Sequence, residues 1–358
     1  NYSNDFSIEN LEVIRRYQSN EDNVFFAYSE FSYNTLVGAY EPFLDIICNM
    51  HRRFIGGSFD DFQKECGVYY LHRQVLNSYY ETGECFREET VLLNEVAYEQ
   101  RRMTMAIADM LKKLSEVKPL MIVINRFQMA SKSSIETIKY LIDNPCANIG
   151  IVLGVNAIVK GTDSTVEVWD RIVESLEDRS AIYYIGSAGP LKNNVKTTND
   201  DELYITMNFE QSIQEASNIM EFLDFEQARR GCRIIEHKLK FEDAWIDEKS
   251  LRRFYMVYAR TSVLLGEMSK AIELTNEYKA LIPENDSEHY LSLYYFMKGT
   301  CYMYQGKLEK AGNSAKSAYD YAVLAEDDTL IFKAELLSVM IKMSGWYNIF
   351  FCVQAVSY

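Results

Sequence analysis

Residues 120–124 read Leu-Met-Ile-Val-Ile, an apolar run between Pro119 and the polar pair Asn125-Arg126. A short run with a β-branched centre is typical of a strand buried in a parallel sheet. Apolar residues then recur with helical spacing at positions 135, 138, 141 and 142, and the hydroxyls of Ser133 and Ser134 can cap the first turn of that helix. A second apolar run occupies residues 149–155. Strand, helix and strand within about forty residues predict a βαβ unit.

Residues 122–131 read Ile-Val-Ile-Asn-Arg-Phe-Gln-Met-Ala-Ser. With Gln128, Ala130 and the helix that follows, this frame resembles the Walker B region of the signal-transduction ATPases with numerous domains, the STAND class of P-loop ATPases. In that family two acids end the strand, one to hold Mg²⁺ through water and one to polarise the attacking water. Asn125 and Arg126 occupy those positions here. The resemblance implies an AAA/STAND-like α/β sheet, and the replacement of both acids implies a degenerate nucleotide site and disfavours ATP hydrolysis.

The segment before this unit extends the resemblance. Residues 24–28, Val-Phe-Phe-Ala-Tyr, predict a strand, and Tyr40-Glu41-Pro42-Phe43 resembles the helix start that follows the equivalent strand in the STAND class. The glycine-rich loop GxxxxGK[ST] does not occur in the sequence, and Gly56-Gly57-Ser58, which lacks the lysine, predicts a turn. We therefore expect no cofactor in this chain, with ATP or ADP and Mg²⁺ bound only if a P-loop exists upstream of residue 1. Either the loop was removed upstream of residue 1 or this lineage lost it, and the sequence leaves both alternatives open.

Composition limits the function classes. The 358 residues include 52 acids against 37 lysines and arginines, and a net charge of -15 is unfavourable for a broad nucleic-acid surface, so nucleic acid is expected only through a domain outside this chain. Seven cysteines without a CxxC pair indicate reduced thiols and no structural disulfide. Because no apolar run approaches the ~20 residues that cross a bilayer and no signal peptide is recognisable, a cytoplasmic protein without membrane contact is expected.

A zinc site is an alternative interpretation of residues 48–72. The candidate zinc ligands are Cys48, His51, Cys66 and His72. Their spacing does not fit a zinc finger, and Cys48 falls on an apolar helix face, so no metal is expected. Further along, Glu99, Arg101 and Arg102 are expected to form the solvated face of an amphipathic helix instead of a sensor or arginine finger.

The α/β series is predicted to end before a polar stretch. Residues 166–176 predict a short helix and residues 181–185 a further strand. Residues 188–207 contain Gly189-Pro190 and a run of acids with little apolar surface to bury. We therefore predict an α/β domain at 1–187, a linker at 188–207 and a helical domain at 208–358.

The sequence of the predicted helical domain contains an internal repeat. Similar segments begin at Asp224, Glu267, Lys307 and Trp346, at intervals of 43, 40 and 39 residues. A glycine is predicted at the tight turn before each of the last three segments, at Gly266, Gly306 and Gly345. This pattern resembles tetratricopeptide-like helix pairs, and in particular the helical sensor arrays of STAND transcription activators of the maltose-regulon-activator type. The resemblance implies an all-α superhelix with a concave binding surface.

Tyrosines are dense in the repeats, and Tyr294, Tyr295 and Tyr302 are the candidates for binding a protein, a peptide or a small inducer in the groove. The resulting hypothesis is a fragment of a bacterial-type signalling or transcription-regulating STAND protein whose nucleotide switch is degenerate or truncated. The alternative is a non-enzymatic scaffold that binds a peptide or protein in the groove. A metabolic enzyme is disfavoured because no nucleophile is paired with a base.

The apolar residues from 341 to 353 are too many for a terminal repeat, so we also expect truncation at both ends and self-association.

Overall fold

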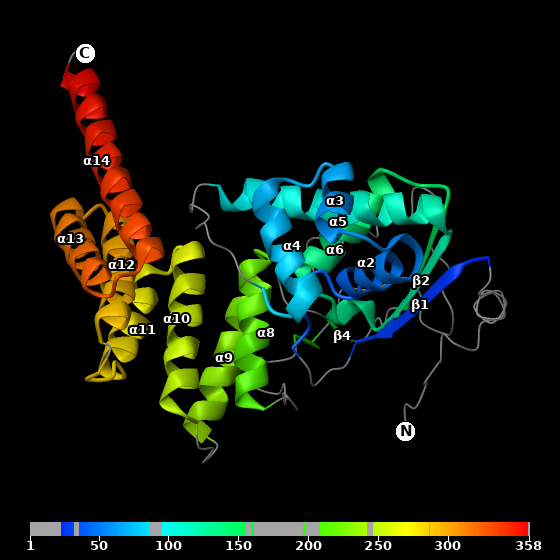
Figure 1. Cartoon of the computed structure of the whole chain (residues 1–358), viewed down its shortest axis with the longest axis horizontal. Helices are drawn as coiled ribbons and strands as arrows, with labels where there is room; N and C mark the ends of the chain where they lie inside the picture. Colours follow the sequence, from blue (N-terminus) through cyan, green and yellow to red (C-terminus); the bar gives the residue numbers. More distant parts are fainter. Residues whose placement is uncertain are drawn as a thin grey trace. The chain divides into compact units, whose positions relative to one another are not determined.

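The computed structural model describes residues 23–31, 36–85, 95–154, 159–160, 196–197, 208–241, 246–285 and 287–356 (Figure 1). The chain forms two compact units, Asn1–Lys238 and Leu239–Tyr358. The first contains a small parallel sheet with helices, and the described part of the second contains helices alone. Across the described ranges, no helix combines the length and the apolar character that crossing a membrane requires.

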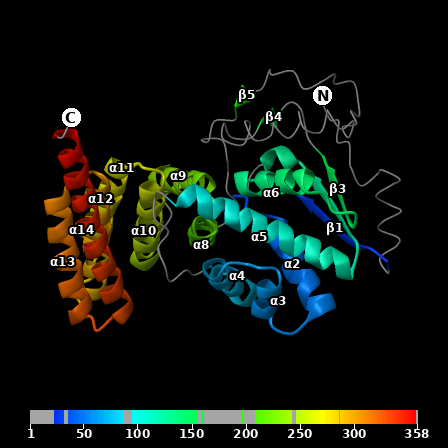
Figure 2. The same ribbon diagram turned by 90° about the horizontal axis from the view of Figure 1, so that it is seen from above.

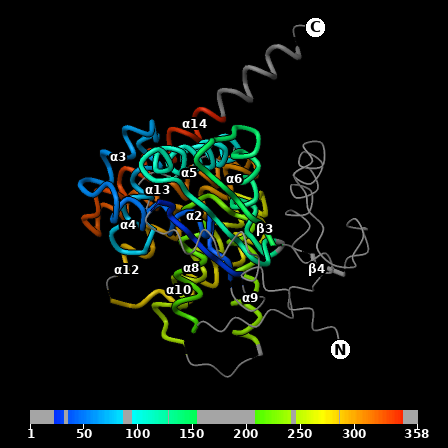
Figure 3. The backbone as a smooth tube through the Cα atoms, turned by 90° about the vertical axis from the view of Figure 1, so that its right-hand side faces the viewer, coloured from blue at the N-terminus to red at the C-terminus, as the bar shows by residue number. Residues whose placement is uncertain are grey.

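The sheet of the first unit has the strand order β1-β2-β3, and all three strands are parallel (Figure 3). The strands are β1 (Phe25–Glu30), β2 (Leu120–Asn125) and β3 (Ile149–Leu153). In the central strand, Ile122, Val123 and Ile124 are fully buried, as a strand covered on both faces requires. Helix α6 (Lys132–Asp143) joins β2 to β3, which confirms the βαβ unit. A separate parallel pair of two-residue strands is formed by β4 (Val159–Lys160) and β5 (Lys196–Thr197).

Within the described residues, four α-helices precede β2. They are α2 (Phe43–Met50), α3 (Phe59–Glu65), α4 (Tyr70–Thr82) and α5 (Val96–Val117). Helix α5 lies between α2 and α6, where its apolar stripe, which includes Met103, Ile107 and Leu111, is completely buried (Figure 2). The predicted helix at 166–176 and strand at 181–185 lie outside the described residues, as does the predicted linker at 188–207 apart from β5.

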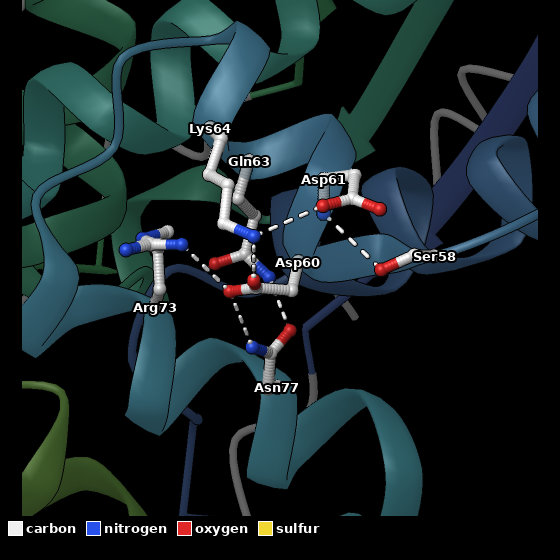
Figure 4. A network of polar contacts seen from close by, with 7 residues as sticks. All are labelled: Ser58, Asp60, Asp61, Gln63, Lys64, Arg73 and Asn77. Carbon is white, nitrogen blue, oxygen red and sulfur yellow. Dashed lines mark hydrogen bonds and ion pairs between the residues drawn. The ribbon is translucent and has the colours of Figure 1, made fainter.

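A polar network joins α3 to α4 (Figure 4). The carboxylate of Asp60 accepts hydrogen bonds from Arg73 Nη1 at 2.9 Å and Asn77 Nδ2 at 3.1 Å, and it pairs with Lys64 Nζ at 2.7 Å. Asn77 Oδ1 in turn accepts from the buried Gln63 Nε2 at 2.6 Å. The glycines before α3 have left-handed backbones, with φ of 68° at Gly56 and 73° at Gly57, so the predicted turn is confirmed.

Six of the remaining described helices, α8 to α13, form three pairs, and the same type of turn joins the two helices of each pair. The pairs are α8 (Phe209–Glu221) with α9 (Phe225–Phe241), α10 (Glu248–Leu264) with α11 (Met268–Ala280), and α12 (Ser287–Tyr304) with α13 (Leu308–Leu324). The turns contain a left-handed residue, with φ of 69° at Leu223, 78° at Gly266 and 72° at Gly306. In each turn, the residue after the left-handed one donates its backbone N–H to the carbonyl of the residue five positions earlier, as in Glu267 N to Ser262 O at 2.8 Å. This is the Schellman arrangement, and it confirms the predicted turns at Gly266 and Gly306.

The third predicted glycine turn, at Gly345, is wrong. Helix α14 (Asp328–Val356) runs without interruption through Ser344 and Gly345. The left-handed turn lies earlier, at Glu326 with φ of 54°, and Asp327 Oδ1 caps α14 by accepting the N–H of Leu330 at 3.0 Å. A glycine inside a helix costs only about 1 kcal/mol, which packing along a 29-residue helix can offset. Glycine alone therefore does not end this helix.

The compact units divide between Lys238 and Leu239, whereas the sequence predicted a linker at 188–207. The difference arises because α8 and most of α9 belong to the first unit. Asn218 of α8, for example, donates to Gly83 O at 3.0 Å and accepts from Cys85 N at 2.9 Å. These contacts fix one helix pair to the segment after α4.

Candidate functional site

Asn125 and Arg126, the predicted degenerate nucleotide site, lie at the carboxyl edge of the sheet. Asn125 Oδ1 accepts the N–H of Arg126 at 3.0 Å, and Arg126 has a left-handed φ of 56°. An asparagine that hydrogen-bonds the local backbone favours such a turn. The chain then enters one short helical turn (Phe127–Met129), with Phe127 completely buried. Arg126 is thereby positioned by the backbone at the end of β2.

The guanidinium of Arg126 pairs with an acid from the neighbouring strand. Its Nη2 atom lies 3.1 Å from Glu30 Oε1, and its Nη1 donates to the carbonyl of Phe31 at 3.5 Å. Tyr28 Oη donates to the second oxygen of Glu30 at 3.1 Å. The pairing follows from the sheet, because Glu30 is opposite Asn125 in the parallel register of β1 and β2. The ion pair is half-exposed, with 36% of the Arg126 and 35% of the Glu30 side chain accessible.

This arrangement limits the chemistry at the edge. Mg²⁺ is usually bound through one or two carboxylates together with phosphate oxygens, whereas Asn125 presents a neutral amide and Arg126 a cation. The carboxylate of Glu30, which the structure describes at this edge, is paired with Arg126. Sequence reasoning missed Glu30, although the signal was available: it ends the strand predicted at 24–28, and the carboxyl ends of parallel strands meet at one edge.

The amino end of α6 is lined by buried hydroxyls. Ser131, not the predicted Ser133-Ser134 pair, is the N-cap residue, since its Oγ accepts the N–H of Ser134 at 3.4 Å. Ser133 Oγ accepts the N–H of Tyr40 at 3.0 Å, and Ser134 Oγ donates to Glu41 O at 2.8 Å. The two serines therefore connect α6 to the segment before α2.

Asp224 joins this end of α6 to the turn between α8 and α9. Its Oδ2 accepts the N–H of Ser133 at 3.0 Å and its Oδ1 accepts the N–H of Gln227 at 3.4 Å, while only 4% of the residue is exposed. Two helix amino ends thus share one carboxylate, which stabilises its negative charge. Gln227 Nε2 donates to Val37 O at 3.0 Å and Gln100 Nε2 to Leu223 O at 2.6 Å. We call the contacts of Asp224, Gln227 and Gln100 the polar clasp.

Three carboxyl groups gather beside the clasp. Glu215 of α8 faces Glu41 and Asp45, and burial together with these two charges raises its pKa to about 7. Glu41 accepts the N–H of Gly38 at 2.9 Å, and Asp45 accepts from Tyr79 Oη at 3.3 Å. A Cβ atom on Gly38 would lie 2.9 Å from Glu215 Oε1, so this glycine permits the close approach.

The candidate tyrosines occupy different environments on α12. Tyr294 is only 2% exposed and accepts from Lys298 Nζ at 2.8 Å, so its ring is a packing element. Tyr295 stacks on Tyr321 of α13, with ring centroids 5.6 Å apart and planes inclined by 4°. Tyr302 packs beside a core cluster that includes Met303 and Leu337. Tyr295 and Tyr302 keep the partial exposure that a contact surface requires.

The two histidines among the candidate zinc ligands lie beside other side chains. His51 Nδ1 lies 3.1 Å from Tyr80 Oη, and His72 Nε2 lies 3.1 Å from Glu99 Oε2. Glu99 is 8% exposed, so its predicted place on a solvated face is wrong: its carboxylate lies against the buried His72 and 3.3 Å from Arg102 Nη1. Within the described residues no group of three or more histidines, cysteines or acids is arranged to hold a metal ion.

The sequence matches no protein-family model, and comparisons with curated proteins and with solved structures give no match.

Proposed function

We propose that this chain is a non-hydrolysing part of a STAND-type signalling protein, in which the α/β unit serves as a platform and the helix pairs bind a protein or peptide. The observation that carries the proposal is the ion pair between Arg126 and Glu30. It occupies the sheet edge at which the resemblance places the magnesium and catalytic acids. Because the carboxylate of Glu30 is engaged by Arg126, it is not a free ligand for Mg²⁺ at this edge.

The helix pairs support a binding role. Their left-handed turns recur at intervals of 43 and 40 residues, from Leu223 to Gly266 to Gly306. In this proposal the pairs of the second unit, α10 with α11 and α12 with α13, stack as in a tetratricopeptide array, whose concave face is a surface for extended peptides or protein segments. Tyr295 and Tyr302 would contribute amphipathic rings to that face, since tyrosine offers apolar area and a polar tip.

The polar clasp supports coupling between the α/β sheet and the first helix pair. Asp224 reaches across 91 residues of chain to the first turn of α6, and α6 follows the sheet edge that carries Arg126. A partner that moved α8 and α9 would therefore act directly on α6. This gives a signalling module a physical connection between a helical sensor and the sheet.

Calorimetric titration with Mg-ATP and Mg-ADP tests the non-hydrolysing role. We expect no binding by the 358-residue chain at micromolar ligand. Micromolar binding that requires Mg²⁺, together with loss of binding in Glu30→Gln, would overturn the proposal, because it would show that Glu30 holds the metal. Glu65→Gln is the matched control for the loss of one carboxylate, since Glu65 is exposed on α3.

The second candidate is an active nucleotide switch in a longer chain that supplies GxxxxGK[ST]. It is favoured by the parallel sheet and by the helix that follows β2, both of which the STAND frame needs. Nucleotide binding by such a longer chain and not by these 358 residues would separate the two candidates.

A further inference from the structure

Helix α14 has two apolar faces. One face packs on α12 and α13 and contains Leu330, Ala334, Leu337 and Ile341, which are 5%, 1%, 2% and 8% exposed. The opposite face, which we call the outer stripe, contains Phe332, Leu336, Val339 and Met343, which are 60%, 41%, 50% and 55% exposed. A helix at the edge of an array normally has a polar outer face, so this stripe is unusual.

The spacing of the outer stripe is that of a two-helix seam. Its positions are separated by four, three and four residues, as in the alternating core positions of a coiled coil. The same alternation continues in the sequence with Trp346, Phe350 and Val353. Apolar surface of this extent is rare on a monomer and normally marks an interface.

The stripe is also symmetric under reversal of the helix direction. Phe332 and Met343 lie equally far from the midpoint between Leu336 and Val339. Two copies placed antiparallel therefore match a large apolar residue to a large apolar residue at every layer. An exposed acid, Glu335, and an exposed base, Lys342, lie beside the stripe on either side of that midpoint. In an antiparallel pair these two positions face each other across the seam, whereas in a parallel pair they do not.

We propose that the outer stripe of α14 is a dimer interface that binds the same stripe of a second copy in antiparallel orientation. Leu336 packs against Val339 of the partner subunit, and Glu335 pairs with Lys342 of the partner subunit. By the twofold symmetry each ion pair occurs twice. The charge complementarity between Glu335 and Lys342 selects a second copy over an unrelated apolar partner.

Sedimentation equilibrium on the full 358-residue chain tests the interface. We expect a concentration-dependent dimer whose Kd rises by at least about tenfold in Leu336→Gln/Val339→Gln. Val117→Gln is the matched control, because Val117 is 54% exposed on α5, outside the stripe, and this variant should leave the Kd unchanged. Circular dichroism should show native helix content in every variant, since the substituted residues are exposed. A chain that stays monomeric at about 100 µM would overturn the proposal, since specific weak dimers are populated at that concentration.

Charge exchange and cross-linking test the orientation. Glu335→Lys and Lys342→Glu should each weaken the dimer several-fold, and the double variant should recover the original Kd, because the pairs re-form with opposite polarity. Under oxidising conditions a mixture of Leu336→Cys and Val339→Cys chains should form a disulfide-linked heterodimer, while neither variant alone cross-links efficiently. Efficient cross-linking of Val339→Cys with itself, or no recovery in the charge-exchanged chain, would overturn the antiparallel pairing.

Discussion

Asp224 and Ser133 are 91 residues apart in the chain, yet the carboxylate of the first accepts the backbone N–H of the second at 3.0 Å in a buried environment. The bond connects the turn between α8 and α9 to the first turn of α6. It explains why a helix pair that the sequence assigned to the repeats belongs to the unit that contains the sheet.

Asp224→Ala should lower the free energy of unfolding of the first unit by about 2 kcal/mol, because it leaves the buried N–H groups of Ser133 and Gln227 without their acceptor. Urea denaturation followed by circular dichroism measures this loss. Asp247→Ala is the matched control: Asp247 caps α10 through Ser250 N at 2.9 Å but is exposed, so its removal should cost less. Equal losses in both variants would show that the clasp adds nothing beyond ordinary capping.

Asn125→Asp should strengthen Mg²⁺-dependent nucleotide binding in a longer chain that contains a P-loop, because a carboxylate replaces an amide beside the dication. Turnover should stay low, since Arg126 still occupies the position of the second acid. Adding Arg126→Glu should then raise the steady-state rate of phosphate release. Rapid hydrolysis by the unmodified longer chain would mean that other residues supply the acids.

Glu215→Gln should stabilise the first unit in a pH-dependent manner. The folded pKa of about 7 lies above the ordinary value of 4.5, so the folded state holds an extra proton between these values and stability falls as pH rises through this window. The variant has no carboxyl group to ionise at this position, so its free energy of unfolding does not fall in this way. We expect a gain on the order of 1 kcal/mol at pH 8 and almost none at pH 4, measured by urea denaturation. Glu210→Gln, at an exposed position on the same helix, is the matched control variant.

Substitution by alanine should change the stability in opposite directions at Gly266 and Gly345, two of the three glycines at predicted turns. Gly266→Ala should cost about 1 kcal/mol, because alanine is strained at φ of 78°. Gly345→Ala should instead stabilise α14 by up to about 1 kcal/mol, because alanine favours a helix interior. Thermal unfolding of the two variants measures both signs. A loss of stability in Gly345→Ala would indicate a turn at that position after all.

The sheet could be predicted because its signals are local. The apolar runs that became β2 and β3, and the helical spacing that became α6, identify these elements without knowledge of their neighbours. The turns at Gly266 and Gly306 were predicted for the same reason. The turns at Leu223 and Glu326 were missed because the left-handed residue there is not glycine, and only the surrounding hydrogen bonds reveal it.

The site depended on pairings between distant segments, which sequence spacing does not encode. Glu30 meets Arg126 only because β1 and β2 are neighbours in register. Glu99 was predicted on the surface of an amphipathic helix, yet it is buried against His72 of α4, a residue 27 positions earlier in the chain. Asn125 and Arg126 were identified as a site from the sequence, but their electrostatic partner was not.

The polar clasp also has a consequence for how the protein is made. The amide of Ser133 and the carbonyl of Leu223 receive their partners from segments 91 and 123 residues apart. While the chain emerges from the ribosome, the sheet and α6 are therefore exposed well before Asp224 can reach them. Contacts of such long sequence separation are slow to form, and an α/β intermediate with an uncovered helix end is prone to aggregate. Expression yield should thus depend on chaperones that hold the nascent α/β segment until α8 and α9 have been synthesised.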